Sequence, residues 1–354
     1  MTKAPLAQST EPQAPKAPVR VAITGSSGFV GRHLVAHLLR HGYTVRGVSR
    51  AQVSPAGCEH QHVEDYRAPH PLQAAFADCD VVVHLAARAH VLRDTAENPT
   101  LAFREANLDS ATAVAAAAAK VGVRRVVMLS SVGVNGDQSG AQPFHEADAP
   151  APVEPYAISK WEAEQAVARL LAGCVMDYVI LRPTLVYGPD CPGNFRLLLR
   201  LVQKLPVVPL GGLRRPRSLI HVENLCDAIR TALDHPGASR RTFLLSDGVD
   251  LSVSEVAVHL ARGFGKSAAT IWPIPEGLLR ALAALVGRQA AVDKLANSLQ
   301  VDAMDFTAAT GWKAPLAPPQ ALEATARGFA KGEPSPRPES PNGNKLSAGA
   351  KKEL

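Results

Sequence analysis

The sequence predicts an α/β fold with a doubly wound parallel sheet. Short runs of β-branched and other apolar residues alternate with segments of helical spacing through residues 19–182. A glycine-rich turn at residues 24–31 joins the first of these runs to the first helical segment. Residues 81–83 are three consecutive valines, as in strands that are buried on both faces. Strands that alternate with helices of about 10–15 residues indicate βαβ units, and hence a parallel sheet covered by helices on both sides.

The predicted elements follow one another in a regular order. Residues 19–24 form the first strand because they are mostly β-branched or aliphatic. Residues 31–41 form a helix because four aliphatic side chains recur on one face. The later elements are predicted by the same patterns: strands at 43–48, 60–63 and 80–85, a helix at 106–120, a strand at 126–130, a helix at 159–171 and a strand at 178–182.

Composition excludes several classes of protein. The chain has 354 residues, of which 46% are hydrophobic and 20% charged, as expected of a globular protein rather than a disordered one. No apolar run approaches the ~18 residues of a membrane span, and the first 18 residues lack the apolar centre of a signal peptide. The five cysteines contain no CxxC pair, which argues against disulfides and structural zinc. The sequence therefore predicts a cytoplasmic protein without a metal site.

The net charge of +6 raises the question of nucleic acid binding. Residues 1–18 carry +1 of this charge and residues 331–354 carry +2, which leaves +3 on the 312 residues between them. Nucleic-acid-binding proteins usually show a concentrated basic stripe, which this distribution does not supply. A small anionic ligand accounts for the mild excess, so no nucleic acid partner is predicted.

The glycine-rich turn is typical of a dinucleotide-binding site. Three glycines, Gly25, Gly28 and Gly31, follow the first strand at a spacing of three and lead into the first helix. Glycine permits the tight turn, the approach of the backbone to a pyrophosphate and close packing of the helix. The free N–H groups at the helix start then face the anion. A turn that needs glycine only for its conformation is the alternative. With this turn, the predicted sheet is of Rossmann type.

Two positions bear on how the adenosine part of the dinucleotide binds. Dinucleotide folds usually place an acid about 20 residues further on, where it binds the ribose hydroxyls of NAD. Here that position holds Ser49 and Arg50. Arg50 could pair with the 2′-phosphate of NADP, or it could be a solvated arginine at a strand end. Asp65 follows the 60–63 strand and is placed to accept from an adenine amino group, or to serve in a turn.

Three residues form a candidate catalytic group. Ser131 follows the 126–130 strand, and Tyr156 and Lys160 lie four residues apart at the start of a predicted helix. A spacing of four places both side chains on one helix face. The lysine ammonium is expected to lower the tyrosine pKa from about 10 toward neutrality. Tyr156 would then exchange a proton with a hydroxyl or carbonyl oxygen while hydride moves at the same carbon.

These motifs together resemble the extended short-chain dehydrogenase/reductases, the NAD-dependent epimerases and dehydratases that act on nucleotide sugars. The resemblance covers about residues 19–327 and rests on TGSSGFVG (24–31), HLAA (84–87), Asn107, LSSVGVNG (129–136), YAISK (156–160) and RPTLVYGP (182–189). It implies that Ser131, Tyr156 and Lys160 are catalytic, and that Ser131, Asn194 and Arg217 contact the sugar nucleotide. By position it assigns the dinucleotide to Gly25, Ser27, Gly28, Phe29, Val30, Gly31, Arg50, Asp65, Tyr66, Leu85, Ala86, Ala87, Asn107, Tyr156, Lys160 and Pro183.

The resemblance also implies a division of the chain. Residues 19–185 would form the NAD(P)-binding Rossmann domain and residues 186–330 mainly a smaller substrate-binding lobe. The tails at 1–18 and 331–354 are low in complexity and are predicted to be disordered. A homodimer through a four-helix bundle is usual in the family, and the helices at 106–120 and 159–171 are the candidates. Their apolar faces could instead serve only the core of one chain.

Departures from the family pattern narrow the reaction. The 4,6-dehydratases follow the serine or threonine with an Asp-Glu pair, where this chain has Val132 and Gly133. Dehydration is therefore not expected. Asn135 replaces a tyrosine that many members have, which weakens the match to typical galactose epimerases. The runs at 90–107 and 193–202 look most like the enzymes that reduce UDP-4-keto-6-deoxy-N-acetylhexosamine to UDP-N-acetylquinovosamine.

Three hypotheses follow. The first is a reductase of the C4 keto group of a UDP-4-keto-6-deoxy-hexosamine, with NADP or NAD as a dissociable cofactor. The second is a UDP-hexose 4-epimerase with tightly bound NAD. The third is a dinucleotide-binding regulator without chemistry, which would not need Ser131, Tyr156 and Lys160.

Overall fold

A seven-stranded sheet organises the protein. The computed structural model describes residues 18–332 except 54, 90–97, 286, 288–292 and 294–295. In it the strands follow the order β10-β6-β5-β4-β1-β2-β3, and every neighbouring pair is parallel. The predicted fold class, a Rossmann-type doubly wound sheet, is confirmed. The strands are β1 Arg20–Thr24, β2 Thr44–Ser49, β3 Glu59–His62, β4 Val81–His84, β5 Arg125–Leu129, β6 Asp177–Pro183 and β10 Arg241–Leu245.

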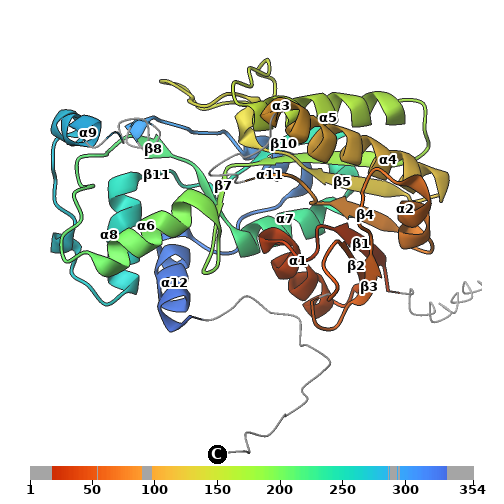
Figure 1. Cartoon of the computed structure of the whole chain (residues 1–354), viewed down its shortest axis with the longest axis horizontal. Helices are drawn as coiled ribbons and strands as arrows, with labels where there is room; N and C mark the ends of the chain where they lie inside the picture. The colour runs from red at the N-terminus through yellow and green to blue at the C-terminus, as the bar shows by residue number, and fades with distance from the viewer. Residues whose placement is uncertain are drawn as a thin grey trace, which may run out of the picture.

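Helices cover both faces of the sheet (Figure 1). Alternate residues of β1 point to opposite faces, so Val21 and Ile23 join one core cluster and Ala22 joins the other. The first face is covered by α1 (Phe29–Arg40) and α7 (Val222–Ala232). The second face is covered by α2 (Pro69–Phe76), α4 (Ser110–Lys120) and α5 (Pro155–Leu171). Burial on both faces explains why β4 is valine-rich.

The last strand of the sheet comes from late in the chain. β10 pairs with β6 and is reached through α7 and the short 3₁₀ helix η3 (Pro236–Ala238). α11 (Met304–Thr310) packs on this edge, where the Phe306 ring meets the Phe243 ring edge-on at 5.1 Å. The boundary expected at residues 185 and 186 stays a prediction. The sheet itself extends beyond it.

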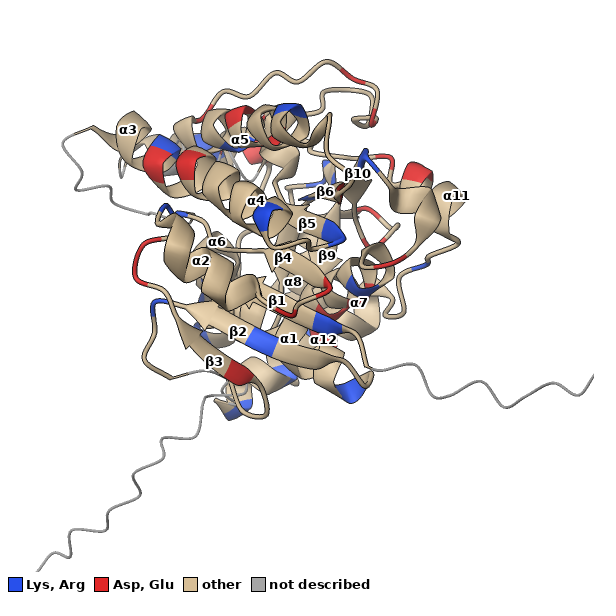
Figure 2. Cartoon of the chain, turned by 90° about the vertical axis from the view of Figure 1, so that its right-hand side faces the viewer, with Lys and Arg blue, Asp and Glu red and all other residues tan. Residues whose placement is uncertain are grey.

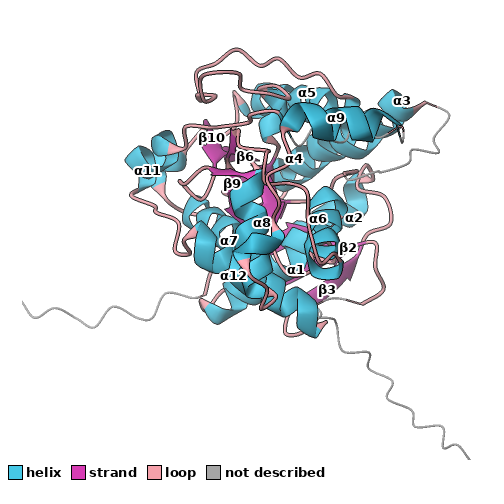
Figure 3. Cartoon of the chain, turned by 90° about the vertical axis from the view of Figure 1, so that its left-hand side faces the viewer, coloured by secondary structure: helices cyan, strands magenta, loops and turns pink. Residues whose placement is uncertain are grey.

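The remaining elements form a smaller lobe with its own core. Three helices pack together there: α6 (Gly193–Lys204), α8 (Val253–Gly263) and α12 (Pro318–Lys331). They are grouped at the left of Figure 1 and face the viewer in Figure 3. The lobe also contains η4 (Ala268–Thr270), α9 (Glu276–Leu285), the parallel pair β7 (Leu185–Tyr187) and β9 (Leu219–His221), and the antiparallel pair β8 (Pro216–Arg217) and β11 (Leu251–Ser252).

The helix predicted at 106–120 differs in detail. The chain enters it through a short helix, α3 (Pro99–Phe103), and one π-helical turn, η1 (Arg104–Asp109). The helix predicted at 159–171 begins earlier, at Pro155, whose fixed φ and missing N–H suit a first helical position. Residues 1–17 and 333–354 of the predicted tails, and residues 90–97 of the 90–107 motif, lie outside the described residues.

Two further expectations concern membrane and nucleic acid. In the part of the chain that the structure describes, no helix is long and apolar enough to cross a membrane. Figure 2 shows basic and acidic segments interspersed over the face that it presents, rather than one basic stripe.

Candidate active site

The glycine-rich turn lies between β1 and α1 at the carboxyl end of the sheet. Gly25 has φ +72°, and a Cβ there would lie 2.8 Å from the backbone nitrogen of Ala86. A Cβ at Gly31 would collide with the carbonyl oxygen of Gly25. Gly28 is the N-cap of α1 and supplies no side-chain cap, and the first turn contains no acid. The spacing of the glycines is therefore required by close approaches that only a hydrogen side chain allows.

The turn fits an anionic dinucleotide on two counts. The uncapped N-terminus of α1 presents backbone donors and the positive end of the helix dipole. The backbone can be approached closely because its glycines have no Cβ.

Tyr66, in the turn that follows β3, contacts the glycine-rich turn through its hydroxyl. Its hydroxyl accepts from the Gly25 backbone N–H at 3.2 Å and donates to the Val48 carbonyl at 2.9 Å. Tyr66 was assigned to the cofactor, and here its polar atom holds the protein's own turn. Leu85 and Ala86 follow β4 beside the turn, where both backbone N–H groups donate to Thr24.

Arg50 and Asp65, which are predicted to contact the adenosine part of the dinucleotide, are both exposed. Arg50 follows β2, as predicted, and its side chain is solvent-accessible. The Asp65 carboxylate is bound by Arg67, with Nε–Oδ1 3.0 Å, and these bonds hold the Asp65 pKa below its usual value. Its role toward an adenine remains a prediction that requires Arg67 to share or release the carboxylate.

The catalytic candidates come together at the start of α5. Tyr156 and Lys160 lie one turn apart on this helix, and the Tyr156 hydroxyl is hydrogen-bonded to Ser131. Ser131 caps the 3₁₀ helix η2 (Val132–Val134), and its Oγ accepts from the Gly133 N–H at 3.1 Å. The Ser131 and Tyr156 side chains therefore lie close enough to interact, as binding one substrate oxygen requires.

The electrostatics differ from the expectation. Burial raises the pKa of Tyr156 to about 12, although the hydrogen bond with Ser131 lowers it. Burial also lowers the pKa of Lys160 to about 8, opposed by the Glu164 carboxylate. The predicted lowering of the Tyr156 pKa by Lys160 is therefore wrong for the protein alone. Desolvation disfavours the phenolate, so Tyr156 is protonated at neutral pH.

A buried ion pair lies one turn beyond Lys160. Arg182 binds Glu164 through two nitrogens, at 3.0 Å and 2.6 Å, and its side chain is 5% exposed. A third guanidinium nitrogen donates to the Asn135 Oδ1 at 3.0 Å. The sequence analysis missed this pair. Its signal is the continuation of the spacing of four, since Tyr156, Lys160 and Glu164 all lie on one face of α5.

Asn107 fixes the opposite wall of the site. It is 1% exposed, and its Oδ1 accepts from the Arg88 N–H at 2.8 Å. Its Nδ2 donates to the Ser159 Oγ at 2.9 Å, and Ser159 donates to the Tyr156 carbonyl at 2.7 Å. Asn107 therefore connects η1 to the start of α5, and its amide is used within the protein.

The remaining assigned residues lie in or near the smaller lobe. Asn194 is in the first turn of α6 and is exposed. Arg217, in β8, donates to the Asn297 carbonyl at 2.9 Å, and burial lowers its pKa. Pro183 is buried at the end of β6 beside β10. The substrate roles of Asn194 and Arg217 stay predictions.

His84 is a further buried group, at the end of β4. Its titration predicts a pH dependence of stability. Its Nδ1 lies 2.8 Å from the Thr24 Oγ1, and burial, together with the Lys160 charge, lowers its pKa to about 3. Between this value and the ordinary 6.5 the unfolded chain binds more protons, so the free energy of unfolding rises with pH across that window. In His84→Asn, we expect this slope to fall by about 1 kcal/mol per pH unit.

Urea unfolding at pH 4.5, 5.5 and 6.5 measures the slope. His62→Asn is the matched control, since His62 is exposed and its replacement should leave the slope unchanged. Equal slopes in wild type and His84→Asn would show that His84 is not held neutral.

Comparisons with known proteins show the family of the chain. Residues 21–245 match the NAD dependent epimerase/dehydratase family. A UDP-glucose 4-epimerase from Vibrio cholerae is 37% identical over 317 residues, which cover 89% of this chain and 96% of the relative. An N-acetyl-alpha-D-glucosaminyl-diphospho-ditrans,octacis-undecaprenol 4-epimerase from Escherichia coli O157:H7 is 27% identical, covering 86% of this chain and 93% of the relative.

More distant proteins extend the comparison. A 4-hydroxy-2-methyl-3-oxo-4-farnesyl-3,4-dihydroquinoline-1-oxide ketoreductase from Stigmatella aurantiaca is 28% identical, covering 66% of this chain and 70% of the relative. The solved structure of a Bordetella bronchiseptica enzyme with NAD and UDP has the same fold, with a TM-score of 0.71 at 20% identity, covering 89% of this chain and 96% of that one. Together with the fold and the Ser131, Tyr156 and Lys160 group, the family match over residues 21–245 leads to one conclusion: this chain belongs to the NAD dependent epimerase/dehydratase family of enzymes.

Proposed function

We propose that the protein reduces the C4 keto group of a UDP-linked 4-keto-6-deoxy-hexosamine. The observation that carries this proposal is the meeting of the Ser131 and Tyr156 hydroxyls above Lys160. A UDP-linked substrate is supported by the V. cholerae relative, a UDP-glucose 4-epimerase, and by the solved neighbour that contains UDP. The ketoreductase among the relatives supports the direction of the reaction.

In this reaction the protein's own residues supply one proton to the C4 oxygen. The dinucleotide, when bound at the glycine-rich turn, supplies the hydride that C4 receives. Ser131 orients the C4 oxygen by a hydrogen bond, and Tyr156 donates its phenolic proton to that oxygen as the carbonyl becomes an alcohol. The Tyr156 pKa of about 12 keeps this proton in place until the oxygen gains charge. Lys160 lies one turn away and stabilises the phenolate that forms.

The same site supports reduction without dehydration. Val132 and Gly133 occupy the positions of the Asp-Glu pair of the 4,6-dehydratases. A Cβ at Gly133 would lie 3.3 Å from the Ala157 Cβ and 3.4 Å from the Ser131 Oγ. An acidic side chain there would crowd the catalytic hydroxyl.

NADP is the proposed cofactor. Arg50 is exposed at the end of β2, where an NAD-specific fold usually has an acid. A guanidinium suits the 2′-phosphate, because it binds phosphate through paired N–H groups. A homodimer through the helices at 106–120 and 159–171 stays a prediction from family resemblance.

A UDP-hexose 4-epimerase is the second candidate, and the 37% identity to the V. cholerae enzyme favours it. An epimerase would oxidise C4, rotate the keto intermediate and reduce it on the other face. It would use the same three side chains and keep its NAD throughout.

Product analysis distinguishes the two: mass spectrometry detects the reduction, and NMR separates UDP-glucose from UDP-galactose, which have the same mass. The purified protein is incubated with UDP-4-keto-6-deoxy-N-acetylglucosamine and either NADPH or NADH, and separately with UDP-glucose alone. We expect one NADPH to be consumed per 6-deoxy product, and UDP-glucose to remain unchanged. Arg50→Ala should raise the KM for NADPH more than that for NADH. Conversion of UDP-glucose to UDP-galactose without consumption of cofactor would instead establish the epimerase.

A further inference from the structure

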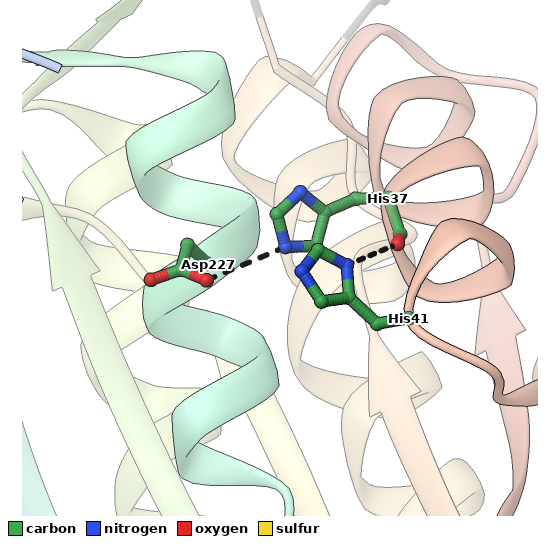
Figure 4. Close-up of side chains that lie close together, drawn as sticks. All are labelled: His37, His41 and Asp227. Atoms are coloured by element: carbon green, nitrogen blue, oxygen red, sulfur yellow. Dashed lines mark hydrogen bonds and ion pairs between the residues drawn. The ribbon is translucent and has the colours of Figure 1, made fainter. Parts of the chain in front are cut away.

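Three metal-ligating side chains lie between α1 and α7, outside the active site (Figure 4). His37 and His41 are one turn apart near the end of α1, and Asp227 is on α7. One ligating atom of each lies within 4.8 Å of the others. His37 is 6% exposed, Asp227 is half-buried and His41 is exposed, so the cluster opens to solvent on one side.

The Nδ1 atom of each imidazole faces an acceptor, although the two rings are stacked, with centroids 4.4 Å apart, and His41 must rotate to share an ion with His37. The His41 Nδ1 lies 2.8 Å from the His37 carbonyl oxygen, which can only accept, so this nitrogen carries the proton. The His37 Nδ1 lies 3.4 Å from the Glu223 Oε2, which likewise accepts. A neutral ring in this arrangement carries its lone pair on Nε2. Metal-bound histidines typically donate their other N–H to a carbonyl or carboxylate in this way.

The His37 Nε2 is the second, independent observation. It is buried and has no hydrogen-bond partner among the described residues, and it lies 3.5 Å from the Asp227 Oδ1. A lone pair that faces a carboxylate oxygen is repulsive. A cation between the two atoms would satisfy both.

The surroundings of Asp227 leave room for a ligand role. The Trp312 Nε1 donates to Oδ2 at 3.0 Å and fixes the carboxylate. Arg230 donates to Oδ1 through Nε at 3.0 Å and Nη2 at 2.9 Å, but its side chain is 32% exposed and can turn into solvent. Displacement of Arg230 would free Oδ1 on the side that faces His37.

We propose that His37, His41 and Asp227 bind a divalent transition metal of the Zn²⁺ class. Two imidazole nitrogens, one carboxylate oxygen and a water would complete a tetrahedral set, with bonds of about 2.0–2.2 Å. The ligand atoms must move closer together than their present spacing, and rotation of the exposed His41 and of Asp227 allows this. The metal would link α1, which begins at the glycine-rich turn, to α7. Its role is structural, because the site is separate from Tyr156.

The alternative to a bound metal is a second proton on the His37 ring. A doubly protonated His37 would donate to Glu223 and Asp227 at once and would satisfy the same atoms. Such a cluster would not bind Zn²⁺, and His41 would contribute little to it.

The test is a Zn²⁺ titration of the full-length chain without an affinity tag, by calorimetry and by the shift in Tm. We expect one Zn²⁺ per chain and a Tm that rises with Zn²⁺. His41→Ala should weaken binding at least about tenfold and abolish the Tm shift. His41 is exposed, so the variant should fold, and circular dichroism without metal checks this. His62→Ala, an exposed histidine on β3, is the control and should match wild type. Absence of binding, or equal binding by wild type and His41→Ala, would overturn the proposal.

Discussion

Replacement of Tyr156 by phenylalanine should lower turnover by about 10²–10⁴-fold, the range for a positioned acid–base group. The variant lacks only the hydroxyl that is hydrogen-bonded to Ser131. The ring itself meets Phe103 edge-on, with centroids 6.1 Å apart, and this contact survives in Tyr156→Phe. We therefore expect the loss in kcat, with binding of the dinucleotide preserved.

Steady-state kinetics with the substrate that the product analysis identifies measure this loss. The quenching of intrinsic fluorescence on titration with NADPH measures cofactor binding. Tyr178→Phe is the matched control. Tyr178 lies on β6, where its ring stacks with the Arg240 guanidinium at 5.9 Å, a contact that does not need the hydroxyl. If Tyr156→Phe retained more than about a tenth of the wild-type kcat, proton transfer by Tyr156 would be excluded.

The parts of the site that could be predicted from sequence are local ones. The glycines of residues 24–31 act through a turn that they form themselves, and Tyr156 and Lys160 share one helix face by spacing alone. Helix and strand periods carry such relations along the chain, so that no tertiary information is needed.

The parts that could not be predicted depend on pairing over long distances. The Tyr66 hydroxyl reaches Gly25, 41 positions away, because β3, which precedes Tyr66, pairs with β2 and β2 pairs with β1. The raised Tyr156 pKa has the same origin, since the burial that raises it is supplied by neighbouring elements rather than by the helix itself.

Replacement of Glu164 by glutamine should lower the free energy of unfolding by about 3–5 kcal/mol, as for other buried pairs that lose one partner. The Arg182 guanidinium would stay buried with its charge uncompensated, because the Asn135 Oδ1 is a neutral acceptor. Lys160 would also lose the carboxylate that opposes the lowering of its pKa, so more of its charge would be lost near neutral pH. The variant should therefore impair catalysis as well as stability.

Urea unfolding of Glu164→Gln and Glu162→Gln provides the comparison on one helix. Glu162 pairs with Arg104 at 2.6 Å, but these side chains are 29% and 47% exposed, so its loss should cost about 0.2–1 kcal/mol. The double variant Glu164→Leu with Arg182→Met removes both buried charges and should be more stable than Glu164→Gln. Equal costs for Glu164→Gln and Glu162→Gln would mean that water reaches the Arg182 pair. In that case burial would also not explain the shifted pKa values of Tyr156 and Lys160, because Tyr156, Lys160 and Glu164 lie on the same face of α5.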